Sequence, residues 1–168
     1  FKDWRDRGLV ARPISEAETY SRNPMHKYPS PGFTVPQYNA CARFYQDDNC
    51  SIIDDDLVGE RMYNEYWFGQ FGTYKAEKHG RYSKLDIYET MFLLKHGSIT
   101  LENCDEQGLY EAARKNNDFF EPIYNVYEDW RMRGFVVKTG FKFGTHFRIY
   151  FPGASPARSI KDLSLIHI

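Results

Sequence analysis

The sequence predicts an α+β fold, in which helices and strands occupy separate stretches of one 168-residue chain. Three observations support this prediction. Two short apolar runs flank a cluster of turn-forming residues near position 46, apolar residues recur at helical spacing in two later segments, and apolar and polar residues alternate from Thr145 onward. The aromatic content of 17% indicates that the chain can bury a core.

The first predicted elements are a hairpin and a helix. Ala40–Tyr45 and Ser51–Ile53 are apolar runs separated by Gln46 to Asn49, whose Asp and Asn side chains favour a turn. This arrangement is typical of two antiparallel strands. A helix is expected from Asp56 through Tyr66.

The next predicted elements are two helices. Ser83 with Asp86 three residues later matches the capping-box pattern, and the apolar positions that follow predict a helix that ends at Gly97. A shorter helix is expected from Glu106 to Lys115.

The last predicted elements are one helix and several strands. Asp118 and Glu121 are expected to open the helix, and Gly134 to end it. Phe135–Thr139 is predicted to be a strand, and Phe141–Phe151 one or two further strands.

An internal repeat indicates how the chain is organised. Residues 1–12 align with residues 127–138, with identities at six of twelve positions, including a Trp and a Gly. Residues 1–12 are therefore interpreted as the tail of a preceding repeat unit. Residues 13–36 are rich in proline and are expected to form an extended linker between the two units.

Both ends of the sequence are those expected of a fragment. The chain opens at Phe1, without an initiator Met, inside a stretch that is typical of a helix. Residues 163–168 match the translation of a transposase adapter used to prepare sequencing libraries, so we expect them not to be native. The alternative, that this hexapeptide is genuine, stays open.

The net charge of −1 conceals two fields of opposite sign. The stretch from Trp130 to Lys161 contains seven basic residues and no acidic one: Arg131, Arg133, Lys138, Lys142, Arg148, Arg158 and Lys161. The stretch from Asp47 to Glu60 contains six acidic residues and no basic one. Such segregation predicts a polyanion-binding face on the second half of the chain.

Tyr150 is the candidate reactive residue of that basic stretch. In a strand, alternate side chains share a face, so Tyr150 is expected beside Arg148, with His146 beyond it. Fixed positive charge favours the phenolate form of a tyrosine, which makes Tyr150 a potential base. The alternative is that this face is simply the solvated side of a half-buried sheet.

The sequence offers no membrane span, metal site or cofactor motif. Its longest apolar runs, such as Met91–Leu94, are far shorter than the ~20 residues that cross a bilayer. Cys41, Cys50 and Cys104 show neither CxxC pairing nor zinc-ligand spacing, which favours a reducing, cytoplasmic location. The acidic triplet Asp54 to Asp56 is typical of a helix N-terminus and is assigned no metal.

Two stretches resemble the archaeal tRNA-splicing endonuclease (tRNA-intron lyase) family. The first runs from Tyr127 to Gly144 and on through His146 to Tyr150, and the second is Lys84 to Leu94 with Gly97. The partial repeat in residues 1–12 is similar to the fused three-unit form of the family. The resemblance implies a small mixed α/β amino-terminal domain over residues 37–116. It also implies the beginning of a mixed-sheet catalytic nuclease domain over residues 117–162.

The resemblance also implies an activity. Family members cut precursor tRNA at a bulge-helix-bulge, without metal or cofactor, and leave 2′,3′-cyclic phosphate and 5′-hydroxyl ends. They use a Tyr, His and Lys triad, in which Tyr150 matches the general base. The His and Lys are expected downstream of the fragment, because His146 precedes Tyr150 and does not match the family His. A homodimer of fused multi-unit chains is implied.

Five residues are expected to contact RNA beside Tyr150. These are Arg148, Lys142, His146, Arg158 and Lys161. The last two lie in a predicted loop and are expected to grip substrate phosphate. The alternative function, from a different class, is a non-catalytic structural and RNA-binding unit of the same splicing assembly.

Overall fold

The computed structural model describes residues 33–72, 82–140 and 144–156, together with the backbone of residues 163–166. The described residues all belong to one compact unit, Gly32–Ile168. The expected repeat tail, and all but the last few residues of the expected linker, lie outside the described residues. The expected domain boundaries stay predictions.

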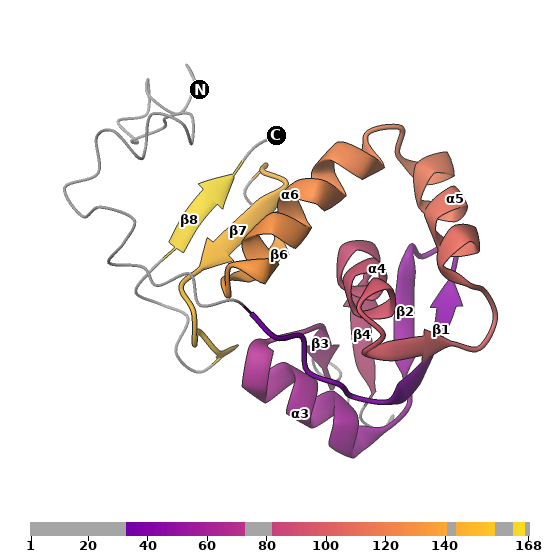
Figure 1. Ribbon diagram of the computed structural model, residues 1–168, viewed down its shortest axis with the longest axis horizontal. Coiled ribbons are helices and arrows are strands. Elements are labelled where there is room, and N and C mark those ends of the chain that lie inside the picture. The colour runs from indigo at the N-terminus through magenta and orange to yellow at the C-terminus, as the bar shows by residue number, and fades with distance from the viewer. Residues whose placement is uncertain (1–32, 73–81, 141–143, 157–162, 167–168) are drawn as a thin grey trace. The chain divides into compact units, whose positions relative to one another are not determined.

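The amino-terminal part of the described chain is built on a mixed sheet. Its five strands have the order β3-β4-β2-β1-β5 (Figure 1). Neighbours pair in antiparallel fashion, except that β5 runs parallel to β1. The strands are β1 (Ala40–Tyr45), β2 (Cys50–Ile53), β3 (Gln70–Phe71), β4 (Ser83–Asp86) and β5 (Ile99–Leu101).

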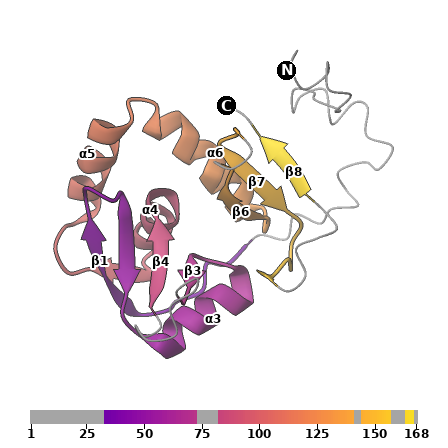
Figure 2. The ribbon, with the colours of Figure 1, turned by 180° about the vertical axis from the view of Figure 1, so that it is seen from behind.

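Four helices are present in the described residues, and a second sheet follows them. The helices are α3 (Asp56–Tyr66), α4 (Ile87–Lys95), α5 (Glu106–Asn116) and α6 (Phe120–Met132). The second sheet has the antiparallel order β6-β7-β8, as the view from behind shows (Figure 2). Its strands are β6 (Val136–Thr139), β7 (Phe147–Tyr150) and β8 (Leu163–Ile166).

One apolar core joins the two sheets. Helix α4 packs against β2, β4 and β5 on one side and against α6 on another. Aromatic rings fill the junction: Tyr88 of α4 lies edge-on to Phe147 of β7, with ring centroids 5.2 Å apart, and Tyr127 of α6 lies 5.7 Å from the same Phe147. Because these contacts link elements far apart in the sequence, they hold β7 against the amino-terminal part.

The start of α4 differs from the prediction. Ser83 does not cap this helix, because Ser83–Asp86 is strand β4, which pairs with β2. The capping box lies three residues later. The Asp86 carboxylate accepts the Glu89 N–H at 2.8 Å, and the Glu89 carboxylate accepts the Asp86 N–H at 3.1 Å. The helix ends as predicted, since Gly97 adopts a φ of 66° directly after the C-cap.

The predicted α+β fold class is confirmed, and so are most of its elements. The hairpin of β1 and β2 and the helix Asp56–Tyr66 are present, and α5 and α6 match their predictions to within about two residues at each end. Strands β3, β4 and β5 were not predicted. Strand β8 falls on the suspected adapter residues, and its pairing with β7 does not test their origin.

Candidate active site

Tyr150 ends β7, the central strand of the second sheet. Its backbone lies opposite Val136 of β6 on one side and opposite Leu163 of β8 on the other. Only 5% of the Tyr150 surface is exposed. The backbone of the candidate base is therefore held from both edges of its strand.

Two of the described side chains lie against the Tyr150 ring. The Arg148 guanidinium carbon lies 5.8 Å from the ring centroid, so these two residues share a face as the alternation predicted. The second neighbour, Trp67, was not predicted: its ring centroid lies 4.8 Å from that of Tyr150, with 43° between the planes. Trp67 follows α3 in the amino-terminal part of the described chain, so this ring pair joins that part to the second sheet.

Of the five residues expected to contact RNA, the structure describes the side chains of His146 and Arg148. His146 is half-buried just before β7, and its carbonyl accepts the Gly140 N–H at 2.9 Å. The Arg148 Nε donates to the Thr139 carbonyl at 3.0 Å, which ties the guanidinium to the neighbouring strand. Lys142, Arg158 and Lys161 lie outside the residues whose side chains are described. The expected RNA contacts of all five residues stay predictions.

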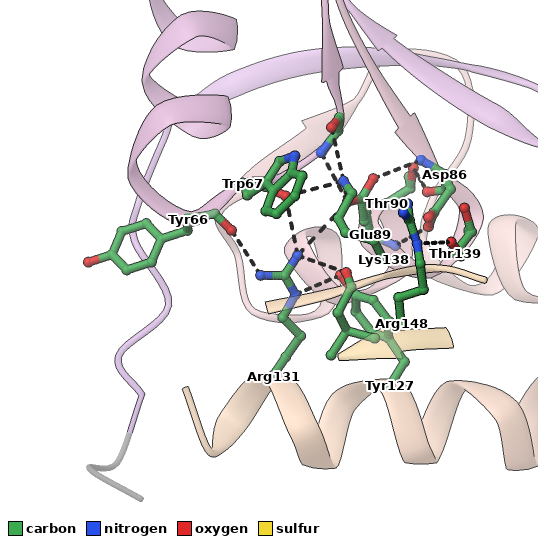
Figure 3. Close-up of polar contacts among 12 residues, drawn as sticks. Tyr66, Trp67, Asp86, Glu89, Thr90, Tyr127, Arg131, Lys138, Thr139 and Arg148 are labelled. Atoms are coloured by element: carbon green, nitrogen blue, oxygen red, sulfur yellow. Dashed lines mark hydrogen bonds and ion pairs between the residues drawn. The ribbon is translucent and has the colours of Figure 1, made fainter. Parts of the chain in front are cut away.

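A buried ion cluster lies beside Trp67 (Figure 3). The Lys138 ammonium of β6 donates to the Glu89 carboxylate of α4 at 2.6 Å and to the Gly69 carbonyl at 2.9 Å. Glu89 also accepts the Gly69 N–H at 3.0 Å. Gly69 has a φ of 70°, and a Cβ there would lie 2.9 Å from the Lys84 carbonyl oxygen, so only glycine fits.

Arg131 of α6 is the second cation of this cluster. Its Nη2 lies 3.9 Å from the Glu89 carboxylate and donates to the Val137 carbonyl at 3.1 Å, and its Nη1 donates to the Tyr66 carbonyl at 2.9 Å. Its Nε donates to the Tyr127 hydroxyl at 3.1 Å. Arg131 therefore joins the end of α3, helix α6 and strand β6 through one buried side chain.

This cluster corrects the predicted basic face. Arg131 and Lys138 were counted among its seven basic residues, but they are only 1% and 8% exposed. Their charges are directed at Glu89, because a buried charge is tolerated only where it is paired and hydrogen-bonded. The prediction was wrong for these two residues, which hold the fold together instead of facing solvent.

The cluster also perturbs Asp86 at the start of α4. Burial, together with repulsion from the nearby Glu89 carboxylate, raises the pKa of Asp86 to about 7, against the opposing attraction of Lys138. A raised pKa means that the folded chain binds this proton more tightly than the unfolded chain. Ionisation of Asp86 therefore lowers stability as the pH rises from about 4 toward 7.

Trp67 has an unusual backbone conformation. Its φ of 51° and ψ of 46° lie in the left-handed region, which costs a bulky residue about 1–2 kcal/mol. The Trp67 carbonyl accepts hydrogen bonds from Lys138 at 3.2 Å and from Arg131 at 3.5 Å. Hydrogen bonds from charged donors are strong enough to offset such a cost.

The sequence carried two signals for these missed residues. Glu89 interrupts the apolar face of α4, and a carboxylate that is buried there needs a cation or a hydrogen-bond donor beside it. Trp67 stands one residue beyond the predicted end of its helix, ahead of Phe68 and Gly69. Neither signal identifies the partner, since Lys138 and Tyr150 come from distant elements.

The acidic triplet forms a helix N-terminus, as predicted. Asp55 is the N-cap of α3, and its carboxylate accepts the Val58 N–H at 2.9 Å. The described residues hold no group of three or more His, Cys, Asp or Glu side chains placed to bind a metal ion. Within the same residues, no helix is long and apolar enough to span a bilayer.

Comparison with known proteins places this site in a family. Residues 120–164, which include α6, β6 and Tyr150, match the family model described as the tRNA intron endonuclease, catalytic C-terminal domain. A tRNA-splicing endonuclease from Pyrococcus furiosus is 33% identical to this chain over 112 residues, which cover 62% of this chain and 66% of that protein. The chain belongs to the tRNA-splicing endonuclease family. Membership agrees with the resemblance carried by residues 127–150.

Two further tRNA-splicing endonucleases show how much of the family this chain spans. The one from Methanococcoides burtonii is 30% identical over 137 residues, which cover 79% of this chain and 37% of that protein. The one from Thermococcus onnurineus is 34% identical over 97 residues, which cover 55% of this chain and 53% of that protein. The chain therefore spans about one to two thirds of the relatives that it matches.

Proposed function

We propose that this chain is part of an RNA endonuclease that cleaves precursor tRNA at the exon–intron boundary, in a bulge-helix-bulge. The cut is a metal-independent transesterification that leaves 2′,3′-cyclic phosphate and 5′-hydroxyl ends. One observation carries the proposal: Tyr150 ends β7 inside the residues that match the family's catalytic domain, with Arg148 against its ring. The names of the relatives support tRNA as the substrate.

Tyr150 is assigned the role of general base. It removes the proton of the 2′-hydroxyl, whose oxygen then attacks the adjacent phosphorus while the bond to the 5′-oxygen breaks. The proposal also requires a His that protonates the leaving oxygen and a Lys that stabilises the charged transition state, both placed after Tyr150 in the chain. No cofactor or metal takes part in this scheme.

RNA is held beside Tyr150 by the predicted basic residues. Arg148 lies on the same face as Tyr150, and we assign phosphate or base contacts also to Lys142, His146, Arg158 and Lys161. The active assembly is a homodimer of fused multi-unit chains, which the similarity of the internal repeat to the fused three-unit form of the family supports. We place the enzyme in the cytoplasm.

A non-catalytic, RNA-binding unit of the same assembly is the second candidate. The observation that favours it is the 5% exposure of Tyr150, since a general base must come within hydrogen-bond reach of its substrate. The presence of a His soon after the loop that follows Phe151, and of a Lys further on, separates the two candidates. Sequencing the gene beyond the codon for Asp162 shows whether the reading frame encodes that His and that Lys.

The test uses the full-length protein that carries this sequence. Purified protein is mixed with a precursor tRNA that contains a bulge-helix-bulge, in the presence of EDTA, and the ends of the products are identified. We expect cleavage at both boundaries with 2′,3′-cyclic phosphate and 5′-hydroxyl ends. A precursor in which the bulges are replaced by paired bases is the control and is expected to stay intact.

Two outcomes contradict the proposal. Loss of cleavage in EDTA that is restored by a divalent ion overturns the metal-independent mechanism. Binding of the precursor without any cleavage, by a protein whose frame encodes no further His and Lys, favours the structural unit instead.

A further inference from the structure

We propose that Trp67 is a positioning residue for Tyr150, which holds the phenol ring in the orientation that proton abstraction needs. The inference rests on the proposed function, because it assumes that Tyr150 is the general base. It adds a residue from outside the segment that matches the catalytic domain, which begins at residue 120.

The first step of the argument is the ring contact. Centroids 4.8 Å apart with 43° between the planes place the Trp67 indole in direct contact with the Tyr150 phenol (Figure 3 shows Trp67 beside the ion cluster). Pairing with β6 and β8 fixes the Tyr150 backbone but not the rotation of its side chain. The side chains that cover the phenol restrict that rotation, and Trp67 supplies the larger flat surface.

The second step is that Trp67 itself is held firmly. Its left-handed backbone is retained by hydrogen bonds from Lys138 and Arg131 to its carbonyl oxygen. The next residue, Phe68, is fully buried, and its N–H donates to the Met62 carbonyl at 3.0 Å. Strained conformations of this kind persist only where the surroundings over-determine them, and they cluster at functional sites.

The third step is that the two cations are held as well. Lys138 and Arg131 both lie against the buried Glu89 carboxylate, at 2.6 Å and 3.9 Å. A continuous set of contacts therefore runs from Glu89 through the cations to the Trp67 carbonyl, and from the indole to Tyr150. Catalytic groups are productive only when such a supporting shell fixes their orientation, because a displacement of about 1 Å can cost about 10²-fold in rate.

The experiment compares Trp67 variants with a matched control in the full-length protein. Single-turnover cleavage and precursor-tRNA affinity are measured for Trp67→Ala, Trp67→Leu, Trp67→Phe and Trp130→Ala. Trp130 is the control because it is also a half-buried tryptophan, but its ring packs on Phe135, at 4.9 Å, and not on Tyr150. The same Trp67 changes are repeated in a Tyr150→Phe background.

We expect Trp67→Ala and Trp67→Leu to lower the single-turnover rate constant by about 10²-fold, with the dissociation constant of precursor tRNA nearly unchanged. Trp67→Phe should recover most of the rate, and Trp130→Ala should retain it. In the Tyr150→Phe background, the Trp67 changes should cause no further loss, which a merely structural role cannot explain. If Trp67→Ala does not fold, Trp67→Leu and Trp67→Phe carry the same comparison.

Each contrary outcome has a distinct meaning. Full activity of Trp67→Leu, combined with loss of activity in Tyr150→Phe, overturns the positioning role and leaves the proposed function standing. An equal loss in both backgrounds, or a weaker affinity at an unchanged rate, overturns it as well, since Trp67 then acts on stability or on RNA. Full activity of Tyr150→Phe instead removes the general base, and with it the proposed function's mechanism.

Discussion

At the scale of single residues, Glu89 decides how the two sheets meet. Its carboxylate is 2% exposed and accepts hydrogen bonds from Lys138, from the Gly69 N–H and from the Asp86 N–H. Removing the closest cation leaves the buried carboxylate poorly compensated, which costs more than the intact pair contributes. The cluster is therefore sensitive to single substitutions.

Lys138→Met should strongly destabilise the chain. We expect the free energy of unfolding to fall by about 3–5 kcal/mol, because the Glu89 carboxylate loses its closest cation while staying buried. Urea denaturation followed by circular dichroism measures the change. The control is Lys115→Met, at an exposed position of α5, for which a change within about 0.5 kcal/mol is expected.

Adding Glu89→Gln tests the cause of that loss. The double variant no longer contains the carboxylate that lost its closest cation, and Arg131 keeps its hydrogen bonds to the Tyr66 and Val137 carbonyls, so the double variant should be more stable than Lys138→Met alone. Equal stability of Lys138→Met and Lys115→Met would show that the Glu89 charge is not held in the manner described.

At the scale of elements, Glu128 ties α6 to the end of α4. Its carboxylate accepts Lys95 Nζ at 2.8 Å and lies 3.0 Å from His96 Nε2. Burial alone raises the pKa of Glu128, but the hydrogen bonds from Lys95, His96 and Tyr124 outweigh it and lower the pKa below its ordinary value. Because the pKa of Glu128 is lower in the folded chain than in the unfolded chain, its ionised form stabilises the fold at any pH above the ordinary carboxyl pKa. This contribution is lost as the pH falls through the pKa of the folded chain.

Glu128→Gln should therefore destabilise the chain in a pH-dependent way. We expect a loss of about 1 kcal/mol near pH 7, which shrinks toward zero as the pH falls from about 5 to about 3. Chemical denaturation of both proteins across that range is the measurement. Glu65→Gln, whose partner Arg61 lies 3.9 Å away on the exposed face of α3, should show little change. A Glu128→Gln loss that stays constant with pH would refute the ionic tie.

The elements also show what the sequence could and could not predict. Helix α3 and the hairpin were predictable because caps, turn formers and apolar spacing act within a few residues. Strand β4 was hidden because two capping patterns overlap, from Ser83 and from Asp86, and only pairing with β2 decides between them. Such pairing is a long-range contact that local periodicity does not contain.

The same distinction applies to the site. The placement of Arg148 beside Tyr150 followed from the period of a strand, and the structure agrees. The contacts of Tyr150 with Trp67, and of Lys138 with Glu89, connect the second sheet to the residue after α3 and to helix α4, so nothing local encodes them. The count of charges along the sequence predicted that Arg131 and Lys138 face solvent, because composition does not report which side chains are buried.

At the scale of the whole molecule, the number of basic side chains that can contact RNA is smaller than the sequence predicts. Of the seven basic residues between Trp130 and Lys161, two are internal, and Arg133 pairs with Asp129 at 3.1 Å. In the proposed function, Arg158 and Lys161 supply phosphate contacts. Each such contact releases counterions and adds to the salt dependence of binding.

Replacing both Arg158 and Lys161 with Ala in the full-length protein should weaken precursor-tRNA binding. We expect the slope of log affinity against log salt concentration to become shallower by about 1.5 to 2, since two phosphate contacts are lost. Filter binding over a series of salt concentrations measures it. The charge-matched control replaces Arg114 and Lys115 of α5 with Ala, and an equal effect of both pairs would refute a specific phosphate grip.

The central claim is that Tyr150 is the base of an RNA-cleaving site, and Tyr150→Phe in the full-length protein tests it most directly. This change removes only the hydroxyl and keeps the ring that packs against Trp67. Single-turnover cleavage of a bulge-helix-bulge precursor should slow by about 10²- to 10⁴-fold, with the affinity for that precursor unchanged. Cleavage at the rate of the unaltered protein would contradict this role of Tyr150.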